Sequence, residues 1–242
     1  MGKKMGKIGI IGAMDVEINI FCEEMKKNGS LKKTESGNLV FNEGTLCGKD
    51  VVVVKSGIGK VNAALCAQRL IIQFDVKKII NTGIAGAIQE GLHIHDMVVS
   101  TDAVYHDMDV TAFGYEPTEI PQMHASAFDA DEKMIQAAEK AFALSESAKK
   151  YKLVLGRIAS GDQFVSYSEQ KEHIEEICSP SCVEMEGAAI AHACFLNQIP
   201  FVILRCISDN ADDSYEVTYS FNEKIASEEC AAVVLKMLEF LD

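Results

Sequence analysis

The chain has 242 residues, and its 23 Lys and Arg against 36 Asp and Glu give a formal charge of −13. With 48 % apolar residues it can bury the core of a large domain, which excludes a disordered protein. The negative charge argues against nucleic acid and anionic membranes, which bind to basic faces. The three arginines are Arg69, Arg157 and Arg205, too few to favour a multi-arginine phosphate clamp.

The predicted elements alternate between short β-rich runs and helical patterns. Strands are predicted, in chain order, at 7–12, 51–54, 78–82, 97–100, 153–160 and 200–207. Helices are predicted between and after them, at 15–27, 61–74, 131–147, 185–197 and 222–241. Strands that are apolar throughout are covered on both faces, so the pattern predicts a mainly parallel α/β sheet in one domain, 1–242. Residues 1–6 are expected to form a flexible N-terminus.

The segment from 106 to 128 has no clear periodicity and holds two prolines, Phe113 and Tyr115. Long irregular segments of this kind are typically lids, binding loops or partner-facing loops.

The eight cysteines are scattered, mostly within apolar runs, which predicts buried free thiols and a cytoplasmic protein. No apolar run approaches the roughly 18 residues of a spanning helix. Cys178 and Cys182 are too isolated for a zinc site, and His93 and His95, at the end of a predicted strand, are expected to be a surface pair. Neither a metal nor a cofactor is expected.

Ligands of α/β sheets bind beyond the carboxyl ends of the strands, so the residues that follow each strand are the candidates for a site. Glycines and carboxylates recur there, and the carboxylates are Glu17, Glu184, Glu186 and Asp209. Several carboxylates around one pocket suit chemistry that develops positive charge or needs an acid and a base together.

Three of these carboxylates also have a purely structural interpretation. Glu17 could stabilise the first turn of a helix, Glu186 could cap the next buried helix, and Asp209 could form an Asx turn. The run Gly57–Asn62 lacks the third glycine of a dinucleotide-binding fingerprint and the Ser or Thr of a P-loop, which excludes both.

Taken together, the motifs resemble those of the 5′-methylthioadenosine/S-adenosylhomocysteine nucleosidases, in the nucleoside phosphorylase superfamily. The matching residues cover nearly the whole chain in order: Ile8–Met14 with Glu17, Lys55–Val61, Ile80–Gly83, Tyr105–Tyr115, Ser160–Asp162, Val183–Glu186 and Arg205–Asp209. The resemblance implies a three-layer α/β/α domain with a central mixed, largely parallel twisted sheet. It also implies a homodimeric hydrolase of methionine salvage that releases adenine from both nucleosides without a cofactor.

The resemblance also implies roles for individual residues. Asp209 would protonate N7 of the adenine leaving group, Glu17 would activate the attacking water, and Glu186 would hold the ribose hydroxyls. The remaining substrate-binding residues that it implies are Met14, Ile58, Phe164, Val165, Met185, Arg205, Ser208 and Phe221, with Val110, Phe113 and Pro121 reaching into the partner subunit's pocket.

One position departs from the family pattern. Many relatives carry Ser or Thr where this chain has Ile84, and that hydroxyl supports the catalytic Asp. Ile84 cannot donate a hydrogen bond, so Asp209 must be supported by other groups or titrate differently.

Three rival functions remain at this point. A nucleoside phosphorylase would need a cation for phosphate where this chain has Glu17. Hydrolysis of 6-amino-6-deoxyfutalosine uses the same chemistry, and the apolar 5′ pocket does not exclude it. A non-catalytic nucleoside-binding module has no need of Glu17 and Asp209 together.

Overall fold

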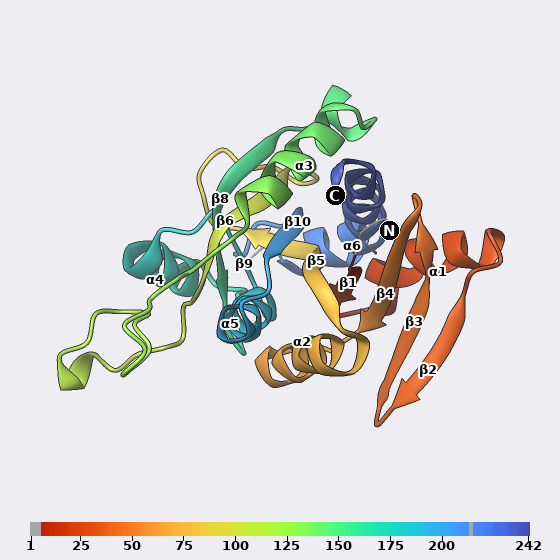
Figure 1. Ribbon diagram of the computed structural model, residues 1–242. Helices are drawn as coiled ribbons and strands as arrows, with labels where there is room; N and C mark the ends of the chain where they lie inside the picture. Colours follow the sequence, from red (N-terminus) through yellow and green to blue (C-terminus); the bar gives the residue numbers. More distant parts are fainter. Residues whose placement is uncertain (1–5, 213–214) are drawn as a thin grey trace.

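A computed structural model describes residues 6–212 and 215–242, with side chains described over 6–212 and 222–242. Within these ranges ten strands form one mixed sheet through the middle of the molecule (Figure 1). The strands are β1 (Lys7–Gly12), β2 (Lys32–Ser36), β3 (Leu39–Leu46), β4 (Lys49–Lys55), β5 (Val76–Ala87), β6 (Met97–Tyr105), β7 (Phe128–Asp129), β8 (Leu153–Ser160), β9 (Cys182–Glu184) and β10 (Phe201–Asp209).

Five of these strands close into a ring. β10 pairs in parallel with β5 and antiparallel with β6, and the order β6-β8-β9-β5 completes the circle. β5 makes this possible because its 12 residues pair with β1 at one end and with β9 at the other. The predicted α/β class with a central mixed sheet is confirmed, while the ring is a feature that alternation of strands and helices does not reveal.

Helices cover both faces of the sheet (Figure 1). α2 (Lys60–Phe74) and α5 (Gly187–Asn197) lie on one face, and α1 (Asp15–Lys27), α3 (Glu132–Ala143) and α6 (Tyr215–Met237) lie on the other. α4 (Ser168–Cys178) packs its buried Ile174 and Cys178 against a smaller cluster beside β6 and β8. These layers hold the carboxyl ends of the strands in fixed positions.

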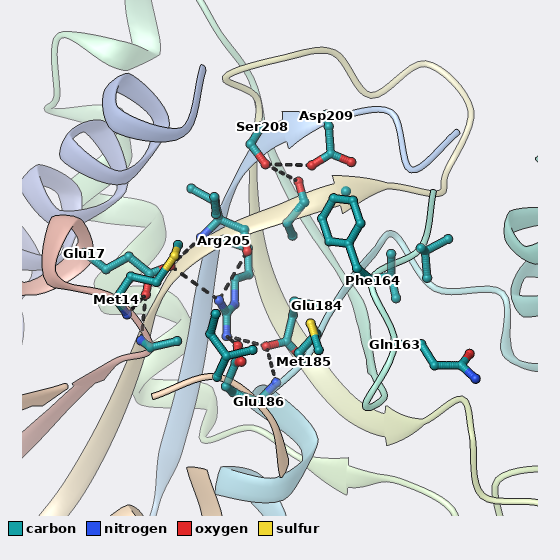
Figure 2. Close-up of a pocket in the computed structure, with 17 residues that line it drawn as sticks. Met14, Glu17, Gln163, Phe164, Glu184, Met185, Glu186, Arg205, Ser208 and Asp209 are labelled. Carbon is teal, nitrogen blue, oxygen red and sulfur yellow. Dashed lines mark hydrogen bonds and ion pairs between the residues drawn. The ribbon is translucent and has the colours of Figure 1, made fainter. Parts of the chain in front are cut away.

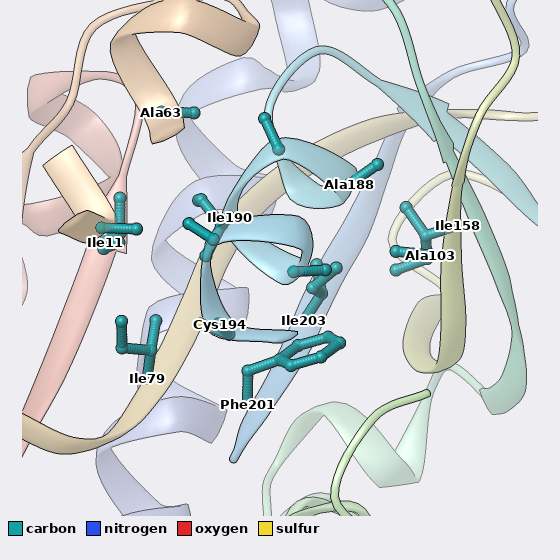
Figure 3. Packing of buried hydrophobic residues seen from close by; sticks show 14 of the residues in the cluster. Ile11, Ala63, Ile79, Ala103, Ile158, Ala188, Ile190, Cys194, Phe201 and Ile203 are labelled. Carbon is teal, nitrogen blue, oxygen red and sulfur yellow. The ribbon is translucent and has the colours of Figure 1, made fainter. Parts of the chain in front are cut away.

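The core between α5 and the sheet is apolar and fully buried. Figure 3 shows Ala188, Ile190 and Cys194 of α5 beside Phe201 and Ile203 of β10, each at most 3 % exposed. Burying a side chain such as Ile or Phe stabilises the fold by about 1.5–3 kcal/mol. The small residues of α5 let this helix approach the strands that carry the site.

Local sequence explains where the predicted helices begin and end. α1 has the predicted bounds, with acids in its first turn and lysines in its last. α3 begins after Asp131, whose carboxylate accepts the N–H of Met134 at 3.0 Å, and it ends before the predicted residue 147. α5 begins at Gly187, two residues later than predicted.

Several elements were not predicted. The hairpin of β2 and β3 is antiparallel, and β2 is largely exposed, so it has no apolar face to reveal it. His93 and His95 lie in the loop before β6 and not at a strand end, and the side chain of His95 is only 13 % exposed. The description of these two residues as a surface pair is therefore wrong for His95.

The segment from 106 to 128 is irregular, as predicted. It contains one short 3₁₀ turn (Thr111–Phe113) and a single bridge between Ile120 and Ala125, and it projects away from the sheet (Figure 1). Among the described residues, no helix is long and apolar enough to cross a membrane. Residues 1–5, which were predicted to be flexible, lie outside the described part of the chain.

Candidate active site

A pocket lies where the central strands end (Figure 2). Residues that follow β1, β4, β8 and β9 line it, together with the last residues of β10. The sequence analysis nominated ten of its lining residues: Met14, Glu17, Ile58, Phe164, Val165, Met185, Glu186, Arg205, Ser208 and Asp209. Side chains from distant parts of the chain thus meet at one edge of the sheet, where α/β proteins bind ligands.

Arg205 organises the charges at the base of the pocket. Its guanidinium is 1 % exposed and donates to the carboxylate of Glu184 and, at 2.6 Å, to Oδ1 of Asn81. The same guanidinium lies 4.0 Å from Glu17 and 3.6 Å from Glu186. One buried cation therefore faces three carboxylates, which makes their burial tolerable but leaves the site negative overall.

Glu17 does more than begin α1. Its carboxylate accepts the N–H groups of Ala13 at 2.6 Å, Met14 at 3.0 Å and Ile84 at 3.2 Å. Burial raises the pKa of Glu17 above its ordinary value, although Arg205 and the three N–H groups oppose the shift. The residue is held in one orientation and is more basic than a surface carboxylate, which suits a base.

Glu184 and Glu186 divide two tasks between them. Glu184 accepts the hydroxyl of Ser160 and the N–H groups of Glu186 and Gly187 at the start of α5, so it is the capping group there. Glu186 accepts the N–H of Gly59 at 2.9 Å and lines the pocket. Burial and the neighbouring Glu184 raise the pKa of Glu186 to about 7. Glu186 is thus free of the capping role and is available to a ligand.

Asp209 is the last residue of β10. Oδ2 accepts the hydroxyl of Ser208 at 2.8 Å, and Oδ1 accepts the N–H of Ala211 at 2.9 Å in an Asx-type bond. Burial raises the pKa of Asp209 even though both donors favour its charged form. Ile84 has no hydroxyl that could donate a hydrogen bond to Asp209. The donors that support Asp209 are instead the hydroxyl of Ser208 and the N–H of Ala211.

The rest of the pocket is mostly apolar. Met14, Val165 and Met185 line its walls, while Ile58 and Phe164 stand at its edge with 54 % and 44 % of their surfaces exposed. An exposed aromatic ring beside a cluster of carboxylates is suited to stack on a flat, electron-poor group. This arrangement fits a ligand with one planar end and one polar, hydroxylated middle.

Three nominated residues do not line the pocket of the same chain. Val110, Phe113 and Pro121 lie on the projecting 106–128 segment, and Phe113 is 82 % exposed. Phe221 lies among the residues whose side chains are outside the described part of the chain.

Sequence reasoning did not assign to the site two side chains that accept hydrogen bonds from Arg205. Glu184 was noted among the strand-end acids but not assigned to the site, and Asn81 was not singled out. Asn81 is 1 % exposed within an otherwise apolar strand, and a polar residue in such a strand is the signal that could have found it.

Among the described residues that line the pocket, Arg205 is the one cationic side chain, and carboxylates already surround it. The carboxylates of the pocket are in turn held by backbone N–H groups and by Arg205, so they are not gathered around a vacant metal-sized centre. The arrangement is suited to stabilising positive charge on a bound organic molecule and to moving protons.

The fold and this site define a member of the phosphorylase superfamily, whose family model matches residues 7–239. The 5′-methylthioadenosine/S-adenosylhomocysteine nucleosidase of Treponema pallidum is 41 % identical over 97 % of this chain and 93 % of the relative. The chain belongs to the family of these nucleosidases.

Solved structures agree with this assignment. The nucleosidase of the same name from Neisseria meningitidis, in complex with methylthio-immucillin-A, is 37 % identical with a TM-score of 0.91, covering 98 % of this chain and 100 % of that one. Futalosine hydrolase of Helicobacter pylori is 33 % identical with a TM-score of 0.90, covering 98 % of each chain.

Proposed function

We propose that this protein hydrolyses the N-glycosidic bond of 5′-methylthioadenosine and S-adenosylhomocysteine, giving adenine and the corresponding thioribose. The observation that carries the proposal is that Glu17 and Asp209 line one pocket and that burial raises the pKa of both. A base for water and an acid for the leaving group are what this reaction requires.

The acid acts on adenine. Adenine leaves poorly as an anion, and protonation at N7 turns it into a neutral leaving group. Asp209 must keep its proton near neutral pH to do this, and its burial favours the protonated form. Ser208 and Ala211 hold the carboxyl group in a fixed orientation while it donates.

The base acts on water. Glu17 keeps one orientation through its three N–H donors, so it can accept a proton from a water that attacks the anomeric carbon. As the bond to adenine breaks, the ribosyl group gains oxocarbenium character, and the negative field of Glu17 and Glu186 stabilises that charge. Arg205 keeps these carboxylates in position without neutralising all of them.

The remaining lining residues recognise the nucleoside. Glu186 would bind the ribose hydroxyls, and Met185 would pack on the sugar. Phe164 would stack on adenine while the backbone of Val165 binds its polar edge. The 5′-thio group would lie against apolar side chains, namely Met14, Ile58 and Phe221.

A homodimer completes this proposal. Large apolar side chains remain exposed on α2, on the 106–128 segment and on α5: Val61, Leu65, Ile72, Phe113, Phe195 and Leu196. Exposed apolar surface of this extent marks an interface with another protein. The partner's copy of the 106–128 segment would close the 5′ side of the pocket with its Val110, Phe113 and Pro121.

The chain is proposed to act as one domain in a reducing cytoplasm. All ten described strands belong to one sheet, which supports a single domain. All eight cysteines are free thiols, and six of them are buried. Thiols that remain unpaired are typical of intracellular proteins.

Adenine release from each nucleoside, with and without inorganic phosphate, tests the proposed reaction. Hydrolysis gives the same rate in both conditions and yields the free thioribose. A rate that requires phosphate, with a sugar 1-phosphate as the product, would instead identify a phosphorylase.

A third substrate belongs in the same assay. The similarity to futalosine hydrolase, at 33 % identity and a TM-score of 0.90, favours testing 6-amino-6-deoxyfutalosine, which releases adenine by the same chemistry. Comparing kcat/KM for the three substrates decides which of them the 5′ pocket prefers.

A further inference from the structure

A second group of ligand-type side chains lies on the other face of β10 from the pocket. Arg205 and Cys206 are consecutive in this strand, so their side chains point to opposite faces of the sheet. Arg205 lines the pocket, whereas Cys206 belongs to the core formed with α6. Glu229 of α6 and His95 of the loop before β6 meet Cys206 there.

The three side chains offer one ligand atom each, and these atoms lie within 4.8 Å of one another. Nδ1 of His95 is 2.9 Å from Oε2 of Glu229, and that oxygen is 4.0 Å from Sγ of Cys206. Tetrahedral Zn²⁺ with such ligands places them about 3.4 to 3.6 Å apart, by the usual bond lengths. The thiol is farther from the carboxylate than this, at 4.0 Å, so Zn²⁺ binding requires Cys206 and Glu229 to move closer together.

The imidazole of His95 and the carboxylate of Glu229 are the closest pair in this group. Nδ1 is buried and has no hydrogen bond of acceptable geometry, although a carboxylate oxygen lies only 2.9 Å away. At this distance a positive charge must lie at the pair: either a proton on the imidazole, which then forms an ion pair with Glu229, or a metal ion bound by both groups. The N–H of His95 donates to the carbonyl of Ile207 at 2.8 Å, which holds the backbone of this residue beside β10.

The chemistry of the three ligands selects the ion. A thiolate, an imidazole and a carboxylate together favour Zn²⁺ over Mg²⁺ or Ca²⁺, which prefer oxygen ligands alone. The site also has access to solvent, since the side chains of His95 and Glu229 are 13 % and 23 % exposed. Glu229 in addition lines a surface hollow between α6 and the end of α3, which provides an entry path.

We propose that His95, Cys206 and Glu229 form a Zn²⁺ site, with water as the fourth ligand, that ties the 93–96 loop, β10 and α6 together. On binding, Cys206 releases its proton to solvent and coordinates as the thiolate. The site is independent of the proposed reaction and lies across the sheet from it.

Equilibrium dialysis of the untagged, metal-stripped chain against Zn²⁺ and a competing chelator tests the proposal. The wild-type chain should bind one Zn²⁺. Cys206→Ala and His95→Asn should each lose about a hundredfold or more in affinity, since removing even an outer-shell partner of a metal ligand costs up to that much. Asn also tolerates the positive φ of 72° at position 95, so that variant should keep its fold.

Matched controls distinguish this site from other thiols, imidazoles and acids. Cys66→Ala removes a buried thiol of α2, and His93→Asn removes the exposed neighbour of His95, so both should bind Zn²⁺ as the wild type does. Co²⁺ should give a sulfur-to-metal charge-transfer band that Cys206→Ala abolishes. Adenine release by each variant reports whether it is folded.

Three results would overturn the proposal. The first is wild-type protein that binds no stoichiometric Zn²⁺. The second is Zn²⁺ bound equally by folded His95→Asn and Cys206→Ala, which would assign it to other groups, such as the pocket carboxylates. The third is a Co²⁺ complex without the sulfur band.

Discussion

Asp209 shows how a single carboxyl group can be kept protonated yet oriented. Burial disfavours its charge, while Ser208 and Ala211 each donate one hydrogen bond to it. Burial has the larger effect, so the pKa is raised. A residue with this balance can give a proton to a leaving group near neutral pH and recover it from solvent afterwards.

Asp209→Asn tests that role directly. The amide keeps the size and the hydrogen-bonding positions of the side chain but has no proton to transfer. We expect kcat to fall by about a thousandfold, within the range measured for general acids, while substrate binding changes little. Steady-state kinetics together with binding of a non-hydrolysable adenine nucleoside measure the two effects.

The control for this variant is Asp15→Asn. Asp15 is an exposed acid two residues before Glu17, and it forms an ion pair with Lys55. It should hydrolyse substrate at the wild-type rate. Turnover by Asp209→Asn near that of the wild type would exclude Asp209 as the acid.

Ser208 sets the pH range over which the acid works. Its hydroxyl donates to Oδ2 of Asp209 and so stabilises the charged form, which lowers the pKa. In Ser208→Ala that effect is lost and the pKa of Asp209 rises further. Because the acid must be protonated, the alkaline limb of the kcat profile should move to higher pH, as measured by adenine release over a pH series.

The acid limb serves as the internal control for Ser208→Ala. It reports deprotonation of Glu17, which Ser208 does not contact, so it should stay in place. An alkaline limb that is unmoved, or that moves to lower pH, would show that another group donates the proton.

At the scale of whole elements, Arg205 joins strand ends that would otherwise repel each other. It projects from β10 toward Glu17 of α1, Glu184 of β9 and Glu186 before α5. Removing the cation leaves three buried carboxylates without their partner. The cost of such a loss is about 3–5 kcal/mol for a buried ion pair.

Arg205→Met should lower the free energy of unfolding by that amount at pH 7, measured by urea denaturation. The loss should shrink as the pH falls. Without Arg205, Glu17 and Glu186 have even higher pKa values, so the folded state binds more protons than the unfolded state, whose Glu side chains titrate near 4.5. Stability that depends on those protons is present at low pH and is lost as the pH rises toward and beyond about 7, where Glu186 titrates in the wild type.

Arg157→Met is the matched control. Arg157 pairs with Asp102 at 2.7 Å, but its side chain is 37 % exposed, so its loss should cost about 1 kcal/mol or less. If both variants lost equal stability, or if the loss in Arg205→Met were the same at pH 5 and pH 7, the buried charge cluster would not behave as argued.

The helices and strands that can be predicted well from sequence are those with a clear residue pattern of their own. α1 and β8 have their predicted bounds, because acids and lysines mark the two ends of α1 and a short, mostly apolar run marks β8. β2 and α4 were not predicted. β2 has largely exposed residues, and α4 buries only Ile174 and Cys178, so neither has a strong periodic signal. Their places depend on contacts with the rest of the fold.

The same distinction applies to the sites. Residues after successive strands could be grouped from sequence, since parallel strands end at one edge of a sheet. The pairing of Arg205 with Glu184 and Asn81 could not, because it depends on which strands are neighbours. The group of His95, Cys206 and Glu229 is likewise invisible in sequence, because its members come from a loop, a strand and a helix that only the fold brings together.

For the molecule as a whole, the open question of most consequence is whether one chain makes a complete site. The pocket of a single chain is lined by the catalytic candidates, yet Phe113 projects away from it with 82 % of its surface exposed. An exposed Phe on a projecting segment gains most if it packs in a second copy of the chain. In the proposed dimer each pocket would therefore contain Asp209 from one subunit and Phe113 from the other.

Complementation between two variants tests this arrangement. Phe113→Ala should raise KM about tenfold or more if the ring fills the partner's pocket, whereas Leu144→Ala, which alters an exposed apolar residue at the end of α3, should not. Co-expressing Phe113→Ala with Asp209→Asn produces hybrid dimers. In each hybrid, one pocket has both defects and the other has an intact Asp209 and an intact Phe113 from the partner. Random pairing restores about a quarter of the pockets, since half of the dimers are hybrids. The co-expressed protein should therefore show more activity at low substrate concentration than the two separate homodimers average. If Phe113 instead acted on its own chain, every Asp209-bearing pocket would still lack the ring, and co-expression would give no gain.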